Sequence, residues 1–415
     1  MKTVEQQCQA ALSASRTLGT ASTQQKNDAL LAMASALESQ TSTVLDANKA
    51  DLENGKKAGF LAAILDRLLL TTDRITAIAQ ALRDIAALPD PIGEVLHGWV
   101  RPNGLKIQKV RVPLGVVGMI YEGRPNVTAD AAALCIKTSN AVVLRGSGSA
   151  YHSNSAIATA LRIGLKTTGL PEQAIQLLED PSRDSANALM RMNKYLSVLI
   201  PRGGASLIQS VVENATVPTI ETGVGICHVY VDASADLQMA TDIIRNAKVQ
   251  RPSVCNACET VLVHADVASR LLPDLVNQLV SLGVEVRGCE VTQTLAQVVP
   301  ATPADWATEY LDLILSVKVV DSLDDAISHI QTYGTQHTEA IITRDLESAQ
   351  RFTEAVDAAA VMVNASTRFT DGGAFGFGAE IGISTQKLHA RGPMGLDVLT
   401  TYKYIVTGTG QIRSD

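Results

Sequence analysis

LGVVGMIYE, residues 114–122, is the first of four short apolar runs; the others are NAVVLRG (140–146), AIQLLE (174–179) and YLSVLIP (195–201). The stretches between these runs are long enough for crossover helices. This alternation predicts a parallel α/β sheet with helices on its faces. Ligands of such sheets bind beyond the carboxyl ends of the strands, so the residues after each run are the first candidates for a site.

The turn after the second run, Arg145 to Ser149, is rich in glycine and serine. It carries the G-x-G of a dinucleotide fingerprint, but Tyr151 stands where the third glycine would be, and no acidic residue follows about 20 positions later. The turn could hold a phosphate or a ribose at a helix N-terminus, or it could be a plain strand-to-helix turn. Arg145 in place of an acidic residue favours a 2′-phosphate, and hence NADP over NAD.

A second glycine turn, PRGGAS at 201–206, follows the fourth run. The consecutive residues Gly203 and Gly204 let backbone N–H groups come close to an anion. Two such turns at one sheet edge are better evidence for a phosphate-binding region than either turn alone.

The segment NAKVQRPSVCNACET, residues 246–260, contains a candidate nucleophile, Cys255. A cysteine reacts as its thiolate, which positive surroundings favour, and Lys248 and Arg251 lie close in sequence. A small buried hydrophobe is the alternative, and the spacing of this window does not decide between them. Cys258 completes a C-x-x-C that could suggest redox or zinc chemistry. A zinc site needs a second ligand pair, and none appears at the expected spacing, so we predict no metal.

Residues outside these motifs indicate helices and a hairpin. Apolar spacing predicts helices in 27–39 and 62–87, with Thr71 at an N-cap inside the second stretch. Asn103-Gly104 predicts a hairpin in 99–112, to which 400–409 could add a strand. Further along, a helix over 267–282 is predicted, inside which Pro273 is a signal for an interruption. The glycine-dense segment 369–385 reads as a long ordered loop.

Composition limits the function classes. The 415 residues suggest two or three domains, and the net charge of −7 argues against a sequence-independent nucleic-acid or anionic-membrane binder. No window reaches 18 consecutive apolar residues, and the N-terminus does not read as a signal peptide. Six scattered cysteines do not resemble a disulfide framework, so we expect a reducing cytoplasm.

The chain resembles the gamma-glutamyl phosphate reductases of the aldehyde dehydrogenase superfamily. The resemblance runs in order along the chain and rests on five segments: YEGRPNVT (121–128), LIPRGGA (199–205), QRPSVCNA (250–257), VVDSLDDAISHIQTYGTQHTEAI (319–341) and STQKLHARGPMGLDVLTT (384–401).

That resemblance implies an α/β, aldehyde dehydrogenase-like fold with three parts. A Rossmann-like NADP-binding domain would comprise 1–97 and 113–231 with 361–398, and an α/β catalytic domain would comprise 232–360. A small β-ribbon of 98–112 and 399–415 would serve oligomerisation, giving a homodimer or homotetramer.

The implied reaction is the NADPH-dependent reduction of L-glutamyl 5-phosphate to L-glutamate 5-semialdehyde and phosphate, the second step of proline biosynthesis. By resemblance, Cys255 is the nucleophile that forms a thioester. Asn126 and the backbone N–H of Cys255 would bind the oxyanion, although Asn126 could also be a turn residue beside Pro125. Glu221 matches the water-activating glutamate of hydrolytic relatives. We expect it to have a structural or proton-handling role, because water attack would waste the thioester.

The expected binding residues come from the two glycine turns and from arginines in or beside the matched segments. The cofactor NADPH would be held by Arg145, Gly146, Ser147, Gly203 and Gly204. The anionic groups of the substrate would be held by a set of arginines, each of which could instead form a structural salt bridge: Arg124, Arg368 and Arg391. His329 and His337 are expected to be packing residues.

One departure from the family pattern concerns the cofactor region. Ser139 stands where the family usually has glycine, and the 146–149 turn replaces a second glycine and the polar and acidic residues after it. We expect both changes to affect NADPH affinity and selectivity.

A separate glutamate 5-kinase is the expected partner. A hydrolytic NAD(P)-dependent aldehyde dehydrogenase and a catalytically silent scaffold are the alternative functions.

Overall fold

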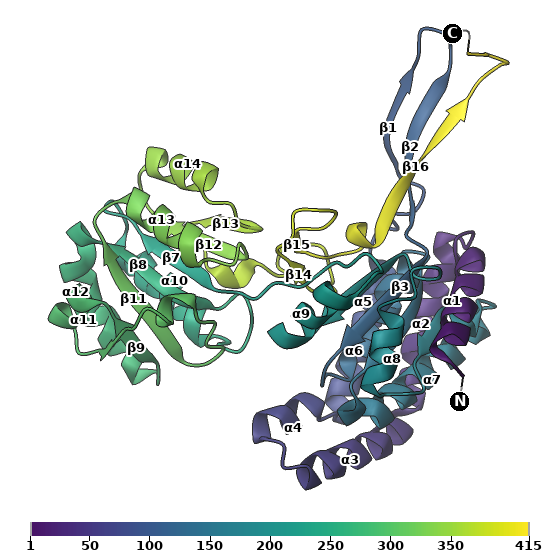
Figure 1. Ribbon diagram of the computed structural model, residues 1–415, viewed down its shortest axis with the longest axis horizontal. Coiled ribbons are helices and arrows are strands. Elements are labelled where there is room, and N and C mark those ends of the chain that lie inside the picture. Colours follow the sequence, from purple (N-terminus) through teal and green to yellow (C-terminus); the bar gives the residue numbers. More distant parts are fainter. Residues whose placement is uncertain (1, 414–415) are drawn as a thin grey trace. The chain divides into compact units, whose positions relative to one another are not determined.

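Figure 1 shows the computed structural model, which describes residues 2–413 apart from the side chain of Ala63. The backbone packs as two compact units. The first contains Met1–Glu221, Phe377–Gly382 and Met394–Asp415, and the second contains Thr222–Gly376 and Ile383–Pro393. Each unit has a parallel sheet of its own.

The sheet of the first unit has four parallel strands in the order β5-β4-β3-β6. They are β3 (Val116–Tyr121), β4 (Ala141–Gly146), β5 (Ile175–Leu177) and β6 (Val198–Arg202). All six residues of β3 are buried, as expected for an inner strand of a parallel sheet. The four apolar runs are therefore the four strands, and the predicted parallel sheet is confirmed.

Nine α-helices of the described chain belong to the first unit. Thr71 caps α5 by accepting a hydrogen bond from the N–H of Arg74, so the stretch 62–87 is two helices, as the N-cap signal predicts. Within residues 2–413, no helix of either unit is both long and apolar enough to cross a membrane. The nine helices are α1 (Val4–Leu18), α2 (Thr23–Ser39), α3 (Thr41–Lys57), α4 (Ala62–Leu68), α5 (Thr72–Ala87), α6 (Asn126–Lys137), α7 (Tyr151–Thr167), α8 (Arg183–Leu189) and α9 (Ala205–Asn214).

A three-stranded antiparallel ribbon combines segments far apart in the sequence (Figure 1). The predicted hairpin is β1 (Val95–Val100) and β2 (Lys106–Pro113), and β16 (Thr400–Thr407) pairs with β2 along its whole length. Gly104 has a φ of +87°, which favours glycine at this turn. The accessory sheet expected from the hairpin and the C-terminal segment is therefore present.

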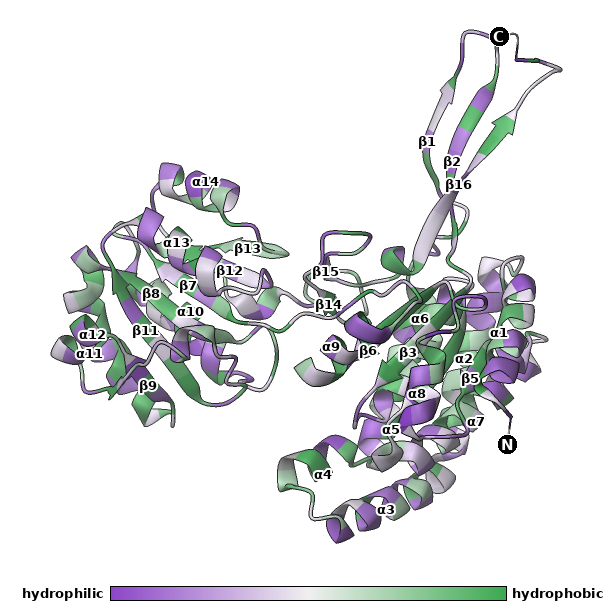
Figure 2. Ribbon diagram, viewed as in Figure 1, coloured by the Kyte–Doolittle hydropathy of each residue, from purple (hydrophilic) through white to green (hydrophobic). Residues whose placement is uncertain are grey.

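The second unit contains a seven-stranded sheet in the order β10-β9-β11-β8-β7-β12-β13, and all its pairings are parallel. Helices α10 and α11 pack against Val229 and Val261, whereas α13 and α14 pack against the opposite face at Tyr230 and Leu262. Figure 2 shows the corresponding hydrophobic colour along these strands. The strands are β7 (Cys227–Val231), β8 (Cys258–His264), β9 (Glu285–Gly288), β10 (Val299–Pro300), β11 (Ile314–Val320), β12 (Thr338–Ile342) and β13 (Ala360–Val363), and the helices are α10 (Leu237–Val249), α11 (Ala265–Ser281), α12 (Glu290–Leu295), α13 (Leu323–Tyr333) and α14 (Leu346–Ala355).

Helix α11 continues through Pro273, so the interruption that proline suggested does not occur. Proline removes one backbone hydrogen bond from a helix interior. A continuous buried face, which includes Leu271, Leu275 and Leu279, packs on the sheet and holds the helix together.

The units differ from the expected domain boundaries in three segments. Residues 222–231 and 361–376 were expected in the first domain, but both lie in the second unit. The reason is sheet pairing: β7 lies between β8 and β12, and β13 pairs with β12. Residues 383–393 also belong to the second unit, where β14 (Ile383–Ser384) pairs with β15 (Gly392–Pro393).

A buried ion pair closes the loop between α10 and β8. The Nζ of Lys248, at the end of α10, lies 2.6 Å from Oε2 of Glu259 on β8, and both side chains are fully buried. Glu259 also accepts a hydrogen bond from the N–H of Leu311. Burial raises the pKa of Glu259 to about 7, although Lys248 lowers it. The pair therefore ties together the two ends of the segment that contains Cys255.

We expect Lys248→Met to lower the free energy of unfolding of the second unit by about 3–5 kcal/mol, because it leaves Glu259 buried without its cation. The double variant Lys248→Met/Glu259→Leu should lose much less. Urea unfolding, followed by the fluorescence of Trp306 in a Trp99→Phe background, measures both. Equal losses in the single and double variants would contradict a direct coupling of the two side chains.

Candidate active site

The turn that contains Cys255 is fixed from two sides. The Asn256 amide donates to the carbonyl oxygen of Thr370 at 2.8 Å, and the Thr367 hydroxyl donates to the carbonyl oxygen of Asn256 at 2.7 Å. On the other side, a Cβ built on Gly225 would lie 1.5 Å from the carbonyl oxygen of Cys255. No side chain fits at position 225, so this glycine lets the two backbones touch.

Cys255 is partly exposed, unlike the two cysteines nearest to it in the structure and the sequence. Cys227 is buried and donates its thiol hydrogen bond to the carbonyl oxygen of Cys255 at 3.2 Å, whereas Cys258 is buried on β8. Burial raises the pKa of both Cys227 and Cys258. A thiol with a raised pKa is a poor nucleophile, so of these three thiols only Cys255 has the exposure that a reacting group needs.

Of the two cations that sequence distance suggested near Cys255, Lys248 is compensated, whereas Arg251 lies close to a further arginine. Lys248 is paired with Glu259, so its charge is compensated. Arg368 instead lies within electrostatic reach of both Cys255 and Arg251. Burial and the neighbouring Arg251 lower the pKa of Arg368, and the negative charges of Asp371 and Cys255 oppose this. Two arginines from distant segments therefore provide the positive environment of this turn.

Three strands of the first unit end side by side at one sheet edge. Tyr121, at the end of β3, pairs with Gly146 of β4 and with Arg202 of β6. The loop after β3 contains Arg124 and leads to Asn126, the first residue of α6. The predicted site residues of the first unit that precede Glu221 thus lie at or just after the ends of three neighbouring strands, as expected for a parallel sheet.

The helix after β4 does not offer the free N-terminal donors that were considered for a phosphate or a ribose. Asp51, from α3, accepts hydrogen bonds from the backbone N–H groups of His152 and Ser153 at 3.2 and 2.8 Å. These donors at the start of α7 are therefore already satisfied by a buried carboxylate. An anion at this turn would have to use Arg145 or Ser147 rather than the helix N-terminus.

At the end of β4, Arg145 and Gly146 have different structural roles. The Nη2 of Arg145 donates to the carbonyl oxygens of Pro181 and Ser182, and its Nε is buried without a partner among the described residues. A Cβ on Gly146 would lie 2.1 Å from the amide nitrogen of Asn154. Close packing accounts for glycine at position 146, whereas Arg145 still has a donor to offer.

The turn after β6 already holds an anionic group. The backbone N–H of Gly204 donates to Oε2 of Glu122 at 2.9 Å, and a Cβ on Gly203 would lie 2.5 Å from the same oxygen. The two glycines thus leave room for an oxyanion beside a backbone donor, which is the geometry that a cofactor phosphate requires. A phosphate at this turn would have to displace the exposed Glu122 carboxylate.

The remaining predicted residues are Glu221 and Arg391. Glu221 is half-buried at the end of the first unit's long segment. Nη1 of Arg391 forms an ion pair with Asp357 at 2.7 Å, which is the structural salt bridge considered from the sequence. Nε and Nη2 of Arg391 are nevertheless buried without a hydrogen-bond partner among the described residues.

Two further expectations concern residues outside the turns. Ser139 precedes β4 at the opposite end of that strand from Gly146, so it does not belong to the cofactor turn as expected. Its φ of +58° explains why glycine suits this position, and Lys26 donates a hydrogen bond to its hydroxyl. His329 and His337 are buried, and burial lowers their pKa values to about 3 and about 4, which fits the expected packing role.

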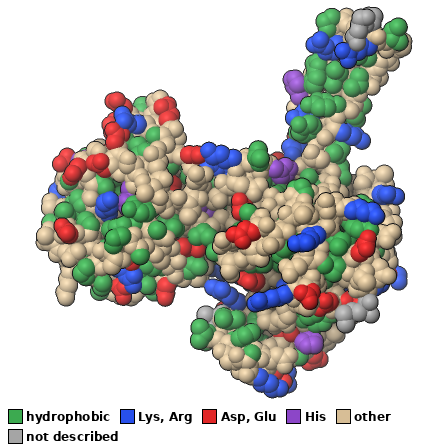
Figure 3. All heavy atoms as spheres, viewed as in Figure 1, with side chains coloured by type: hydrophobic (Ala, Val, Ile, Leu, Met, Phe, Trp, Pro, Cys, Tyr) green, Lys and Arg blue, Asp and Glu red, His purple; other side chains and the backbone are tan. Residues whose placement is uncertain are grey.

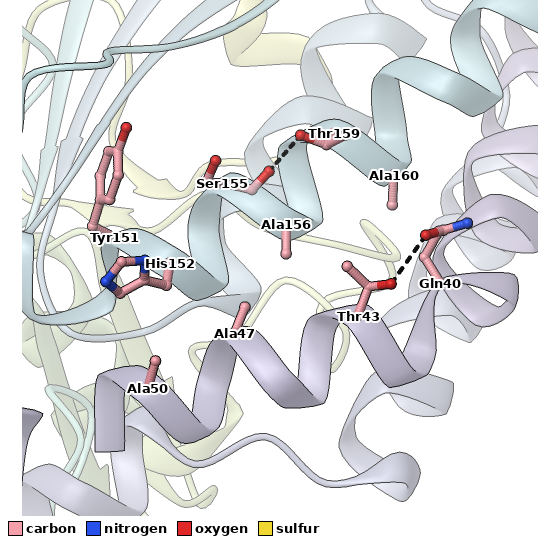
Figure 4. A pocket seen from close by; sticks show the side chains of 10 residues that line it. All are labelled: Gln40, Thr43, Ala47, Ala50, Tyr151, His152, Ser155, Ala156, Thr159 and Ala160. Atoms are coloured by element: carbon pink, nitrogen blue, oxygen red, sulfur yellow. Dashed lines mark hydrogen bonds between the residues drawn. The ribbon is translucent and has the colours of Figure 1, made fainter. Parts of the chain in front are cut away.

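A cavity of about 310 Å³ lies between α3 and α7 (Figure 4). Ala47 and Ala50 of α3 face Ala156 of α7 across it, and Tyr151 lies toward one end. None of the predicted site residues lines this cavity. Among residues 2–413, no three His, Cys, Asp or Glu side chains gather as a metal site would require.

Four residues of the site region were not found from the sequence. Glu122 lies in the segment 121–128 and Asp130 lies two residues after it. Their closeness to Asn126 in the sequence could have marked them as candidates. Gly225 and Asp51 are remote from the groups they contact, and no spacing rule connects them.

Comparisons with known proteins agree along the whole chain. Residues 1–294 match the model of the aldehyde dehydrogenase family. The chain is 59% identical over 404 residues to the gamma-glutamyl phosphate reductase of Clostridium novyi, covering 97% of each protein. It is 60% identical over 413 residues to that of Moorella thermoacetica, covering 99% of this chain and 98% of the relative.

Solved structures give the same result. The crystal structure of gamma-glutamyl phosphate reductase from Thermotoga maritima matches with a TM-score of 0.98 and 48% identity, and the match covers 100% of both chains. An acetylating aldehyde dehydrogenase from Geobacillus thermoglucosidasius, 18% identical with a TM-score of 0.71, shares the fold. The chain therefore belongs to the aldehyde dehydrogenase family and, within it, to the gamma-glutamyl phosphate reductases.

Proposed function

We propose that the protein reduces L-glutamyl 5-phosphate to L-glutamate 5-semialdehyde and phosphate, with NADPH as reductant and Cys255 as nucleophile. The observation that carries this proposal is the environment of Cys255: it is partly exposed in a rigid turn, and Arg368 and Arg251 provide positive charge. The full-length similarity to relatives named for this activity supports it.

The chemistry at Cys255 proceeds through a thioester. The thiolate attacks the acyl carbon, a C–S bond forms, and the C–O bond to phosphate breaks, so that phosphate leaves with the electron pair. A bound nicotinamide cofactor supplies a hydride to the carbonyl carbon. The resulting oxyanion collapses, the C–S bond breaks, and the aldehyde and the thiolate are released.

Negative charge develops on the carbonyl oxygen in both steps, so hydrogen-bond donors must be fixed before the reaction. We assign this role to the Asn126 amide and the backbone N–H of Cys255. The fixed turn supports the second assignment, because the packing of Gly225 on the carbonyl and Cα of Cys255 restrains the backbone of this residue. Glu221 is assigned a proton-handling role rather than activation of water.

The substrate carries a carboxylate and a phosphate, which require cations. Arg368 is the best-supported ligand, because it lies within electrostatic reach of Cys255. Arg391 is proposed as a second ligand, since two of its buried nitrogens have no hydrogen-bond partner within residues 2–413 and need an acceptor. Arg124 completes the proposed set.

NADPH is the proposed cofactor. The glycine turn Gly203-Gly204 suits a phosphate, since the backbone N–H of Gly204 already donates to the Glu122 carboxylate. Arg145 and Ser147 are assigned to the ribose phosphate, because the Nε of Arg145 lacks a partner among the described residues. Gly146 contributes by allowing Asn154 to pack closely.

Assembly into a homodimer or homotetramer through the ribbon is also proposed. Several apolar side chains of the ribbon are exposed, including Val100 at 65%, Tyr404 at 54% and Val406 at 54%. Figure 3 shows hydrophobic atoms along the surface of the ribbon. An exposed apolar face on a three-stranded ribbon suits pairing with a second copy.

A separate glutamate 5-kinase would supply the acyl phosphate.

Two alternative functions are less well supported. A hydrolytic aldehyde dehydrogenase would release glutamate from the thioester, and a silent scaffold would not need a partly exposed Cys255. Incubation with NADP⁺ and L-glutamate 5-semialdehyde separates them. NADPH formation that requires phosphate supports the proposal, whereas phosphate-independent formation supports hydrolysis.

Cys255→Ser should reduce turnover by about 1,000-fold or more, because a serine hydroxyl remains protonated and is a weak nucleophile. The matched control is Cys289→Ser, since Cys289 is the other partly exposed cysteine among the described residues. Its turnover should match the wild type. NADPH formation from the semialdehyde, phosphate and NADP⁺ provides the measurement, and an active Cys255→Ser variant would refute the mechanism.

Arg368→Gln should move the pH profile of iodoacetamide alkylation at Cys255 to higher pH, because removal of a nearby cation disfavours the thiolate. It should also raise the KM for phosphate in the reverse reaction by about 10-fold or more, given the strength of charged hydrogen bonds. Alkylation is measured by mass spectrometry in a Cys289→Ser background. An unchanged profile would remove Arg368 from the surroundings of the thiolate.

Arg145→Ala should weaken NADPH binding by about 10-fold and leave NADH binding nearly unchanged, because the lost charge faces the 2′-phosphate alone. Cofactor fluorescence titration gives both dissociation constants, and a thermal melt controls for the lost contacts to the 181–182 carbonyls. Equal weakening of both cofactors would mean that Arg145 does not select NADPH.

A further inference from the structure

Asp130 lies one helical turn after Asn126 and contacts it directly. Both residues are on α6, and positions four apart lie on the same face of a helix. The Asn126 Nδ2 donates to Oδ2 of Asp130 at 2.9 Å. Both side chains are partly buried. The amide assigned to the oxyanion is therefore held by a carboxylate from its own helix.

A carboxylate fixes an amide in a way that other residues do not. An ionised carboxylate can only accept hydrogen bonds, so Asn126 must turn its NH₂ group toward Asp130. With one N–H bound there, the direction of the second N–H and of the amide oxygen is determined. A neutral partner that can both donate and accept would allow the amide to rotate by about 180° and present its oxygen instead.

The charge state of Asp130 depends on its surroundings. Burial raises the pKa of Asp130 to about 6, whereas the hydrogen bond from Asn126 and the positive charge of Arg202, at the end of β6, lower it. Arg202 is the charged side chain that acts on Asp130 from the neighbouring strand. Above this pKa the carboxylate is an acceptor, and below it the carboxyl group can donate to the amide oxygen.

We propose that Asp130 is a positioning residue: its carboxylate sets the orientation of the Asn126 amide and so directs the second N–H to the developing oxyanion. This inference rests on the proposed function, in which Asn126 is the oxyanion donor. Asp130 itself does not touch the substrate and acts only through Asn126.

The test compares Asp130→Asn with a matched control, Asp84→Asn. Gln80 donates an amide N–H to Asp84 at 2.8 Å, four residues apart on the exposed face of α5, so the control makes the same substitution in the same kind of contact. Asp130→Asn should lower kcat by about 10–100-fold, somewhat less than loss of an oxyanion donor, and leave the NADPH dissociation constant unchanged. Asp84→Asn should match the wild type in both.

Two readouts distinguish positioning from a general structural effect. The wild-type kcat/KM should fall as pH drops through about 6, because protonated Asp130 no longer fixes the amide, and Asp130→Asn should lack this limb. In a double-mutant cycle, Asp130→Asn added to Asn126→Ala should cause no further loss.

The inference would be overturned if the losses of Asn126→Ala and Asp130→Asn multiplied in the double variant. It would also be overturned if Asp130→Asn kept the wild-type kcat and the same fall of kcat/KM at acidic pH. Its failure is separable from that of the proposed function. If Asn126→Ala and Cys255→Ser both retain wild-type turnover, the proposed function fails. If those two variants lose activity and Asp130→Asn does not, only the positioning role fails.

Discussion

The contact of Gly225 with the carbonyl of Cys255 is the constraint on which the candidate site depends. Backbone meets backbone there with no space for a Cβ, so the turn cannot shift toward β7. Asn256 and Thr367 hold its other side by hydrogen bonds, and the buried Lys248–Glu259 pair closes its two ends. A nucleophile that must attack one carbon at one angle benefits from such a fixed backbone.

Carboxylates of the chain itself satisfy many of the groups that attract anions. Asp51 accepts from the start of α7, Glu122 occupies the glycine turn after β6, and Asp357 pairs with Arg391. Unpaired buried donors are costly, and an internal carboxylate stabilises them. Glu122 is exposed and accepts one backbone hydrogen bond at the glycine turn, whereas Asp51 is buried and accepts three hydrogen bonds from His152 and Ser153. This difference favours the N–H group of the glycine turn as a ligand donor, whereas the N–H groups at the start of α7 serve to stabilise the fold.

Prediction from the sequence succeeded where a few neighbouring residues decide the local structure. The four apolar runs became the strands of the first sheet, and the Asn-Gly turn became the hairpin. It failed where a distant partner decided the outcome. Lys248 looked like a neighbour that favours the Cys255 thiolate, but Glu259 compensates its charge, and Arg368 from more than 100 residues away takes its place. The expected domain boundary at 231 differs from the structure because β7 pairs with β8 and β12, which are strands of the second unit's sheet.

The sequence by itself determined the parallel α/β class, the hairpin and the glycine turns. Each of these depends on backbone preferences and side-chain chemistry within a few residues, which are visible in a single window. Tertiary structure alone decided which thiol is exposed, which cations are compensated and which backbone donors remain for a ligand. Those properties depend on burial and on partners brought together by folding, and a linear spacing does not encode them.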